Sequence, residues 1–103
     1  MFKSGDLVVA YYPDRGLDVY RNGIGLFKTQ KESKNSNSLC PQSFDGKYFS
    51  LKIENKPMFV LEVQKCYRQD TLSIKVLGTN GISGWLIFEL NMAKAGWGIK
   101  KIK

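Results

Sequence analysis

Two consecutive runs of this sequence alternate apolar and polar residues with a period of two, as a strand with one buried face does. In MFVLEVQKCY, residues 58–67, one face carries Phe59, Leu61 and Val63. In TLSIKVL, residues 71–77, apolar residues alternate with serine and lysine, and a polar turn separates the two runs. The pattern predicts an antiparallel hairpin whose buried face includes Phe59, Leu61 and Val63.

Further short strands are expected elsewhere. A Ser-Gly step and a Pro-Asp turn bound a strand at residues 6–12, and residues 47–55 alternate as a half-buried strand does. A helical apolar repeat is seen only in IFELNMAKA, residues 87–95. These patterns predict an all-β chain of short antiparallel strands.

The segment before the central hairpin contains a turn signal and a polar stretch. Asn-Gly at 22–23, between the apolar segments 17–20 and 24–28, predicts a tight β-hairpin, because its turn needs positive φ at both central residues. Residues 29–46 are rich in lysine, serine and asparagine. We expect them to form a long polar loop that projects from the fold.

Glycines and a tryptophan precede the last apolar run in GTNGISGWLIFEL, residues 78–90. Gly81 and Gly84 would permit a turn and a close backbone approach, and Trp85 would cover one end of the core. In a chain of 103 residues with 43% apolar residues, short strands bury their apolar faces economically by closing into a small barrel. We expect residues 1–103 to form one such domain, with five to seven strands.

SGDLVVAYY, the 58–77 hairpin and GISGWLIFEL together resemble the SH3-like barrel superfamily. They are most similar to small bacteriophage proteins whose pattern combines Gly-Asp-Leu-Val, Val-Leu-Glu-Val and Gly-Trp. The resemblance covers residues 4–12 and 58–90 and implies a single SH3-like β-barrel encoded by a phage. The acidic loop and paired tryptophans of proline-recognising SH3 domains are missing from the sequence, so proline-rich peptides are not expected partners.

The net charge of +7 is unevenly distributed along the chain. Residues 28–56 carry six lysines against three acids, residues 91–103 carry four lysines and no acid, and the remainder is neutral. Either these lysines only keep the domain soluble, or they form one surface for an anionic partner. The candidate contacts in the loop and the basic C-terminal tail are Lys28, Lys31, Lys34, Lys47, Lys100, Lys101 and Lys103.

Aromatic side chains add to this candidate surface. The chain has more tyrosines and tryptophans than one small barrel can bury, so we expect Tyr11, Tyr12 and Trp97 to contact the partner. Trp85 and Tyr67 are expected in the core. The segment 91–103 around Trp97 is interpreted as an added edge strand, a docking arm or a disordered tail.

The sequence offers little for catalysis or for holding a metal. It lacks histidine, and Cys40 and Cys66 have no CxxC spacing, so both are expected as free thiols. Clustered carboxylates and a phosphate-binding glycine loop are also missing. We therefore predict no catalytic residue, no metal and no cofactor. Without an apolar run of ~18 residues or a secretory signal, we expect a cytoplasmic protein that does not enter membranes.

Together these features predict a non-enzymatic binding module. We expect a phage-encoded accessory, host-interacting or virion-associated protein that acts through a protein partner with an acidic face, in the host cytoplasm or in the virion. The alternative is a nucleic-acid-binding protein that uses the basic loop and tail with exposed aromatic rings. Neither hypothesis specifies an oligomeric state.

Overall fold

The computed structural model describes residues 2–12, 19–36 and 41–102. Strands account for 44% of the described residues and helices for 12%, so the predicted all-β class is confirmed. The elements, in chain order, are β1 (Leu7–Tyr11), β2 (Ile24–Leu26), α2 (Gln30–Lys34), β3 (Gln42–Ser43), β4 (Leu51–Ile53), β5 (Met58–Lys65), β6 (Thr71–Leu77), β7 (Ser83–Glu89), α3 (Leu90–Lys94) and β8 (Gly98–Lys101).

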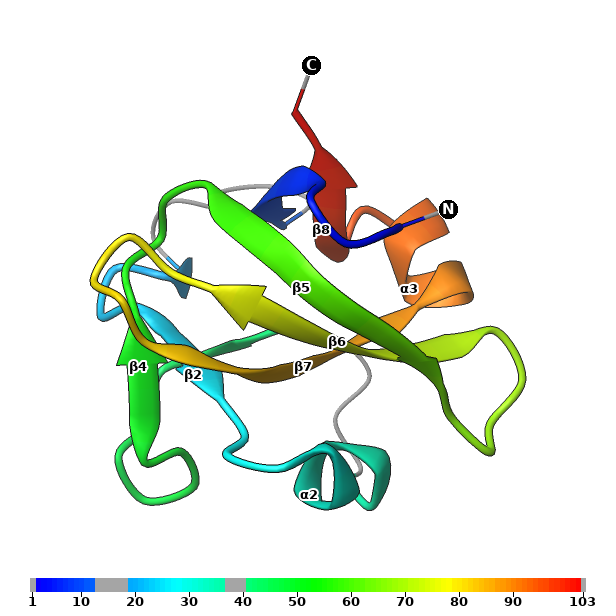
Figure 1. The fold of residues 1–103 in the computed structure, drawn as a ribbon, viewed down its shortest axis with the longest axis horizontal. Helices are drawn as coiled ribbons and strands as arrows, with labels where there is room; N and C mark the ends of the chain where they lie inside the picture. The colour runs from blue at the N-terminus through cyan, green and yellow to red at the C-terminus, as the bar shows by residue number, and fades with distance from the viewer. Residues whose placement is uncertain (1, 13–18, 37–40, 103) are drawn as a thin grey trace.

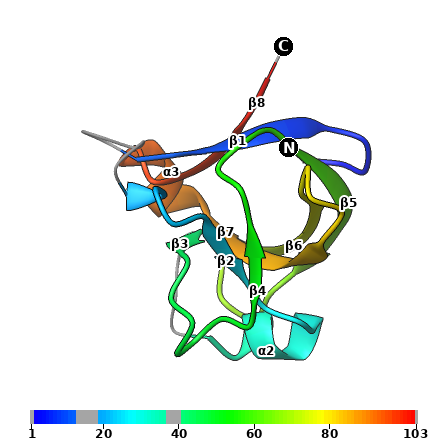
Figure 2. The same ribbon diagram turned by 90° about the vertical axis from the view of Figure 1, so that its left-hand side faces the viewer.

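These strands form two antiparallel sheets (Figure 1). The larger has the order β7-β6-β5-β1-β8, and the smaller has the order β3-β2-β4. Phe27 and Trp85 join them through two backbone hydrogen bonds, of 2.9 and 2.8 Å. The larger sheet curls from β1 through β5 to β7, and β2 continues from its β7 edge (Figure 2). The expected closure into a barrel does not occur, because β8 pairs only with β1 among the described strands.

The core lies between the two sheets. Fully buried aliphatic side chains come from both of them, and burying each such side chain contributes about 1.5–3 kcal/mol. Tyr12, Ala93 and other partly buried residues pack around its edge. The core cluster consists of Val8, Tyr20, Ile24, Leu26, Ile53, Met58, Val60, Ile74, Val76, Leu86, Phe88 and Ile99.

The predicted buried face of the central hairpin is partly wrong. Val60 is buried, whereas Phe59 is 51% exposed and Leu61 is 40% exposed. The register between β5 and β6 shifts between Val60 and Glu62, so Leu61 is an extra residue in the ladder. Because one extra residue reverses the alternation, Val63 packs against the same core as Val60.

The segment 29–46 is also not the projecting loop that was expected. It contains α2 and β3, and α2 packs against β6 and β7. Thr29 caps the helix by accepting the backbone N–H of Glu32 at 3.2 Å. Ser33 is fully buried, and its hydroxyl is hydrogen-bonded to that of Ser73 on β6. Helix α2 therefore covers the outer side of the β6–β7 hairpin.

The Asn-Gly turn is present, but it does not close a hairpin of the predicted kind. Gly23 has φ +97° and donates its N–H to the carbonyl of Tyr20 at 2.9 Å. Val19 and Tyr20 belong to no strand, and residues 17–18 lie outside the described part of the chain. β2 pairs instead with β3 and β4, which come later in the sequence.

The C-terminal segment forms the short helix α3 and the edge strand β8. The helical repeat at 87–95 therefore predicted a real helix, although it begins at Leu90, where Glu89 caps it through its carboxylate. Of the three interpretations of the tail, the edge strand agrees with the structure, since β8 pairs antiparallel with β1. Ile99 anchors this strand in the core.

Candidate functional site

The aromatic residues predicted to contact a partner lie together at the β1–β8 edge. Tyr12 and Trp97 are half-buried, and their ring centroids are 3.9 Å apart at an interplanar angle of 60°. The ammonium group of Lys100 lies 5.7 Å from the ring centroid of Tyr11. The pairing of β1 with β8 brings the two ends of the chain together and so assembles this group.

Two further contacts fix this edge. Tyr11 donates its hydroxyl to the carbonyl of Ala93 at 2.9 Å, and burial raises the pKa of this phenol. Lys101 forms an ion pair with Asp6, at 3.4 Å. The pKa of Asp6 is lowered, first by the hydrogen bond from the backbone N–H of Lys3 and then by Lys101. Lys101 therefore contributes less free charge than Lys100.

The loop lysines lie elsewhere. Lys28, just before α2, and Lys31 on α2 are exposed, and Lys34 on α2 is half-buried. Lys47 is exposed in the turn between β3 and β4. Both views place α2 and β8 at opposite ends of the molecule (Figures 1 and 2). The lysines of α2 and those of β8 therefore do not lie side by side, and a common role of loop and tail lysines in binding stays a prediction. Lys103 and Cys40 lie outside the described residues.

Gly81 lies in a turn and Gly84 at a close approach of two strands, as their spacing predicts. Gly81 has φ +80° in the turn between β6 and β7, and its N–H donates to the carbonyl of Gly78 at 3.1 Å. A Cβ atom on Gly84 would lie 2.8 Å from Cβ of Leu26, so a glycine lets β7 approach β2. Trp85 is buried beside this crossing, whereas Tyr67, also expected in the core, is 95% exposed.

An apolar row crosses the outer face of the larger sheet. Leu7 is directly opposite Phe59, and Phe59 is directly opposite Leu77, so these side chains share one face. Ile102 donates its N–H to the carbonyl of Leu7 at 2.9 Å and is 37% exposed at the end of this row. Leu61 at the bulge adds a further exposed apolar side chain. We call these residues the apolar row: Leu7, Phe59, Leu61, Leu77 and Ile102.

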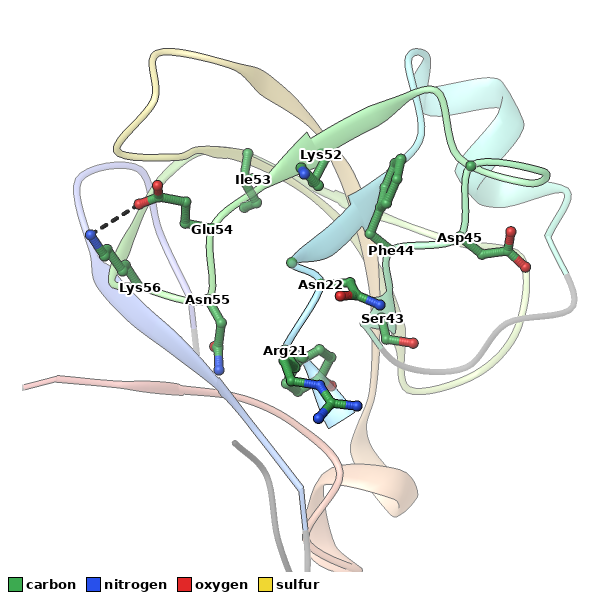
Figure 3. A pocket seen from close by; sticks show the side chains of 13 residues that line it. Arg21, Asn22, Ser43, Phe44, Asp45, Lys52, Ile53, Glu54, Asn55 and Lys56 are labelled. Carbon is green, nitrogen blue, oxygen red and sulfur yellow. Dashed lines mark ion pairs between the residues drawn. The ribbon is translucent and has the colours of Figure 1, made fainter. Parts of the chain in front are cut away.

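A separate polar cleft of about 1020 Å³ opens at the end of the smaller sheet. Its walls are the segments 20–23, 43–46 and 52–56. Figure 3 shows Arg21 and Asn22 between Ser43 on one side and Asn55 on the other. The sequence predicted a turn at 22–23, a polar loop at 29–46 and a strand at 47–55, and no motif joins them. They meet only through the pairing of β2 with β3 and β4.

The described residues include few side chains that could take part in catalysis or bind a metal ion. They hold no cluster of three histidine, cysteine or acidic side chains that could bind a metal ion. The free thiol of Cys66 is half-buried, and this burial raises its pKa, although Lys34 and Arg68 act in the opposite direction. Within the described ranges, no helix is long and apolar enough to span a membrane.

Comparison of the chain with protein-family models, with curated proteins and with solved structures found no match.

Proposed function

We propose that the protein is a non-enzymatic binding module that docks a protein partner on the outer face of its larger sheet. The apolar row carries this proposal. Phe59 and Leu61 expose much of their side chains to water, although the same strand could have placed polar residues there. Contiguous exposed apolar side chains on a small domain are typical of a protein-binding surface, since burying them is favourable.

The positive charge beside the apolar row indicates what kind of partner surface we expect. Lys100 is exposed on β8, directly opposite Val9 of β1, and it forms no ion pair among the described residues. Interfaces commonly combine an apolar centre with a polar rim. The partner should therefore have an apolar patch bordered by aspartate or glutamate. A nucleic acid would match the lysine but would leave the apolar row in contact with phosphates and water.

The sequence resemblance supports a finer form of this proposal. An SH3-like module from a bacteriophage, acting as an accessory, host-interacting or virion-associated protein in the host cytoplasm or in the virion, would use a sheet face of this kind. Fold alone does not specify function, so the partner's identity has to come from binding experiments.

The test compares two variants that remove exposed apolar surface at different places. Phe59→Ser combined with Leu61→Ser removes the centre of the apolar row, whereas Tyr67→Ser removes a more exposed ring in the β5–β6 turn. Proteins captured from a host lysate by the wild type and by the Tyr67 variant, but not by the double variant, would support the proposal. Equal capture by all three proteins would contradict it.

A matched charge variant tests the acidic border of the partner. Lys100→Gln should slow association with the captured partner and reduce its salt dependence, because loss of steering acts mainly on the association rate. Lys31→Gln removes the same charge on the exposed side of α2 and should change neither quantity. Identical association rates for both variants would show that Lys100 does not contribute to the interface.

Nucleic-acid binding is the second candidate. It is favoured by Lys28, Lys31 and Lys47, which are exposed and form no ion pair among the described residues. Mobility shifts with single- and double-stranded DNA and RNA across a salt series would test it, because phosphate binding weakens steeply with salt. A steep salt slope that Lys31→Gln reduces would favour this candidate, and no shift at low salt would exclude it.

A further inference from the structure

The polar cleft is a preformed feature with walls tied to one another. The backbone N–H of Phe44 donates to the carbonyl of Gly23 at 2.7 Å, and Ile24 is paired with both Ser43 and Ile53. The turn at 20–23 is thus held between the other two walls by the smaller sheet. A ligand would find this arrangement already assembled, which lowers the cost of binding.

Both acidic side chains of the cleft are already engaged. Glu54 forms an ion pair with Lys56 at 3.0 Å and accepts the hydroxyl of Thr79 at 3.3 Å, and these contacts lower its pKa. Asp45 accepts the backbone N–H of Lys47 at 2.8 Å, and in Figure 3 its carboxylate points away from Arg21. Neither acid forms an ion pair with Arg21 or Lys52 among the described residues, although the charge of Lys52 also contributes to the lowered pKa of Glu54.

Two cations of the cleft have no ion-pair partner among the described residues. The ammonium group of Lys52 lies 5.4 Å from the ring centroid of Phe44, and its aliphatic chain crosses Gly23, whose missing side chain leaves the space. The side chain of Arg21 is exposed and forms neither an ion pair nor a hydrogen bond with any residue that the structure describes. The cleft is lined by three cations, Arg21, Lys52 and Lys56, against the two acids Asp45 and Glu54, so its lining has a net charge of +1.

Neutral donors complete the site. The amide groups of Asn22 and Asn55 and the hydroxyl of Ser43 line the cleft and form no side-chain hydrogen bond in the described part of the chain. Donors on several walls suit a tetrahedral oxyanion, which accepts hydrogen bonds in several directions. A guanidinium group matches the oxygens of such an anion in a bidentate manner.

We propose that this cleft binds the phosphate group of a small phosphorylated molecule, with Arg21 as the principal ligand. The volume of about 1020 Å³ exceeds what inorganic phosphate alone would fill, and it lies near the upper end of small-molecule sites. The organic part of the ligand would lie toward Phe44 and the aliphatic chain of Lys52. This site is separate from the apolar row and does not depend on the partner proposed above.

The experiment is a titration of the ¹⁵N-labelled full chain, with inorganic phosphate and adenosine monophosphate as probes and acetate at equal ionic strength as the control. The signals of Arg21, Asn22 and Asn55 should shift and saturate with both phosphate probes. Saturation at a lower concentration of adenosine monophosphate would identify a phosphate ester as the source. Saturation by inorganic phosphate alone would identify the free ion.

Arg21→Gln should weaken phosphate binding by about tenfold or more, because charge-assisted hydrogen bonds are lost. Lys94→Gln is the matched control, since it removes the same charge from an exposed residue that does not line the cleft, and it should change the affinity less than about twofold. An unchanged spectrum of Arg21→Gln outside the cleft would show that it folds. Equal shifts with acetate and phosphate, or equal phosphate affinity of both variants, would overturn the proposal.

Discussion

Replacing Gly84 by alanine tests how β7 and β2 are joined. A Cβ atom at this position would lie 2.8 Å from Cβ of Leu26 and 2.9 Å from the carbonyl oxygen of Phe27. Neither atom is the movable end of a side chain, so the strands must separate. Overpacking of this kind costs about 1–3 kcal/mol, and weakening the two Phe27–Trp85 hydrogen bonds adds about 1 kcal/mol each. We expect Gly84→Ala to lower the free energy of unfolding by about 3–5 kcal/mol.

Urea unfolding followed by circular dichroism measures this change. Gly46→Ala is the matched control, because its Cβ would meet only the Phe44 ring, at ordinary distances of 3.7 and 3.8 Å. It should alter the free energy of unfolding by less than about 0.5 kcal/mol. A loss below about 1 kcal/mol for Gly84→Ala would refute the close approach of the strands as the reason for this glycine.

Two further predictions concern stability. Ser33→Ala leaves the buried hydroxyl of Ser73 without its partner on α2, so the free energy of unfolding measured in urea should fall by about 1–2 kcal/mol. The double variant Ser33→Ala with Ser73→Ala should lose less stability than the sum of the two single variants. The pKa of Asp6 is depressed from its ordinary value of 3.8 by the N–H of Lys3 and by Lys101, so its contribution to stability is present above that value and is lost as pH falls through the folded pKa. Melting temperatures of Asp6→Asn should therefore fall less than those of the wild type between about pH 5 and pH 3, and parallel curves would contradict this.

The strand content of the larger sheet could be predicted because its signals are local. Period-two alternation identified β5 and β6, and the spacing of Gly81 and Gly84 identified a turn and a strand crossing. The faces of β5 could not be assigned in this way. A bulge at Leu61 inserts one residue, and alternation alone carries no information about such an insertion. Phe59 and Leu61 were therefore predicted on the buried face, whereas the structure places them on the outer face.

A local signal for α2 was present but was not used. Thr29 and Glu32 have the spacing of a capping box, which indicates the start of a helix even in a polar segment. The low apolar content of α2 obscured its burial, because the side chain that packs against the sheet is the hydroxyl of Ser33 rather than an aliphatic group. Polar contacts of this kind depend on Ser73, which lies 40 residues away in the chain.

The candidate sites depend on tertiary pairing for the same reason. The sequence predicted Tyr12, Trp97 and Lys100 as partner contacts from residue type and charge alone. Pairing of β1 with β8 places them at one edge, and their role in binding stays a prediction. The sequence could not show that these three residues lie apart from the lysines of α2, because a count of charges along the chain does not give positions in space. Arg21 and Asn55 were recognisable only as turn residues until β2 brought them into one cleft.

Hydrogen–deuterium exchange of the protein with and without its captured partner tests the proposed binding face most directly. If the partner docks on the apolar row, amides of β1, β5 and β8 should exchange more slowly in the complex, while those of α2 and of the cleft turn at 20–23 should keep their rates. Protection confined to α2 and its neighbouring turns, with unchanged exchange in β5, would contradict the account.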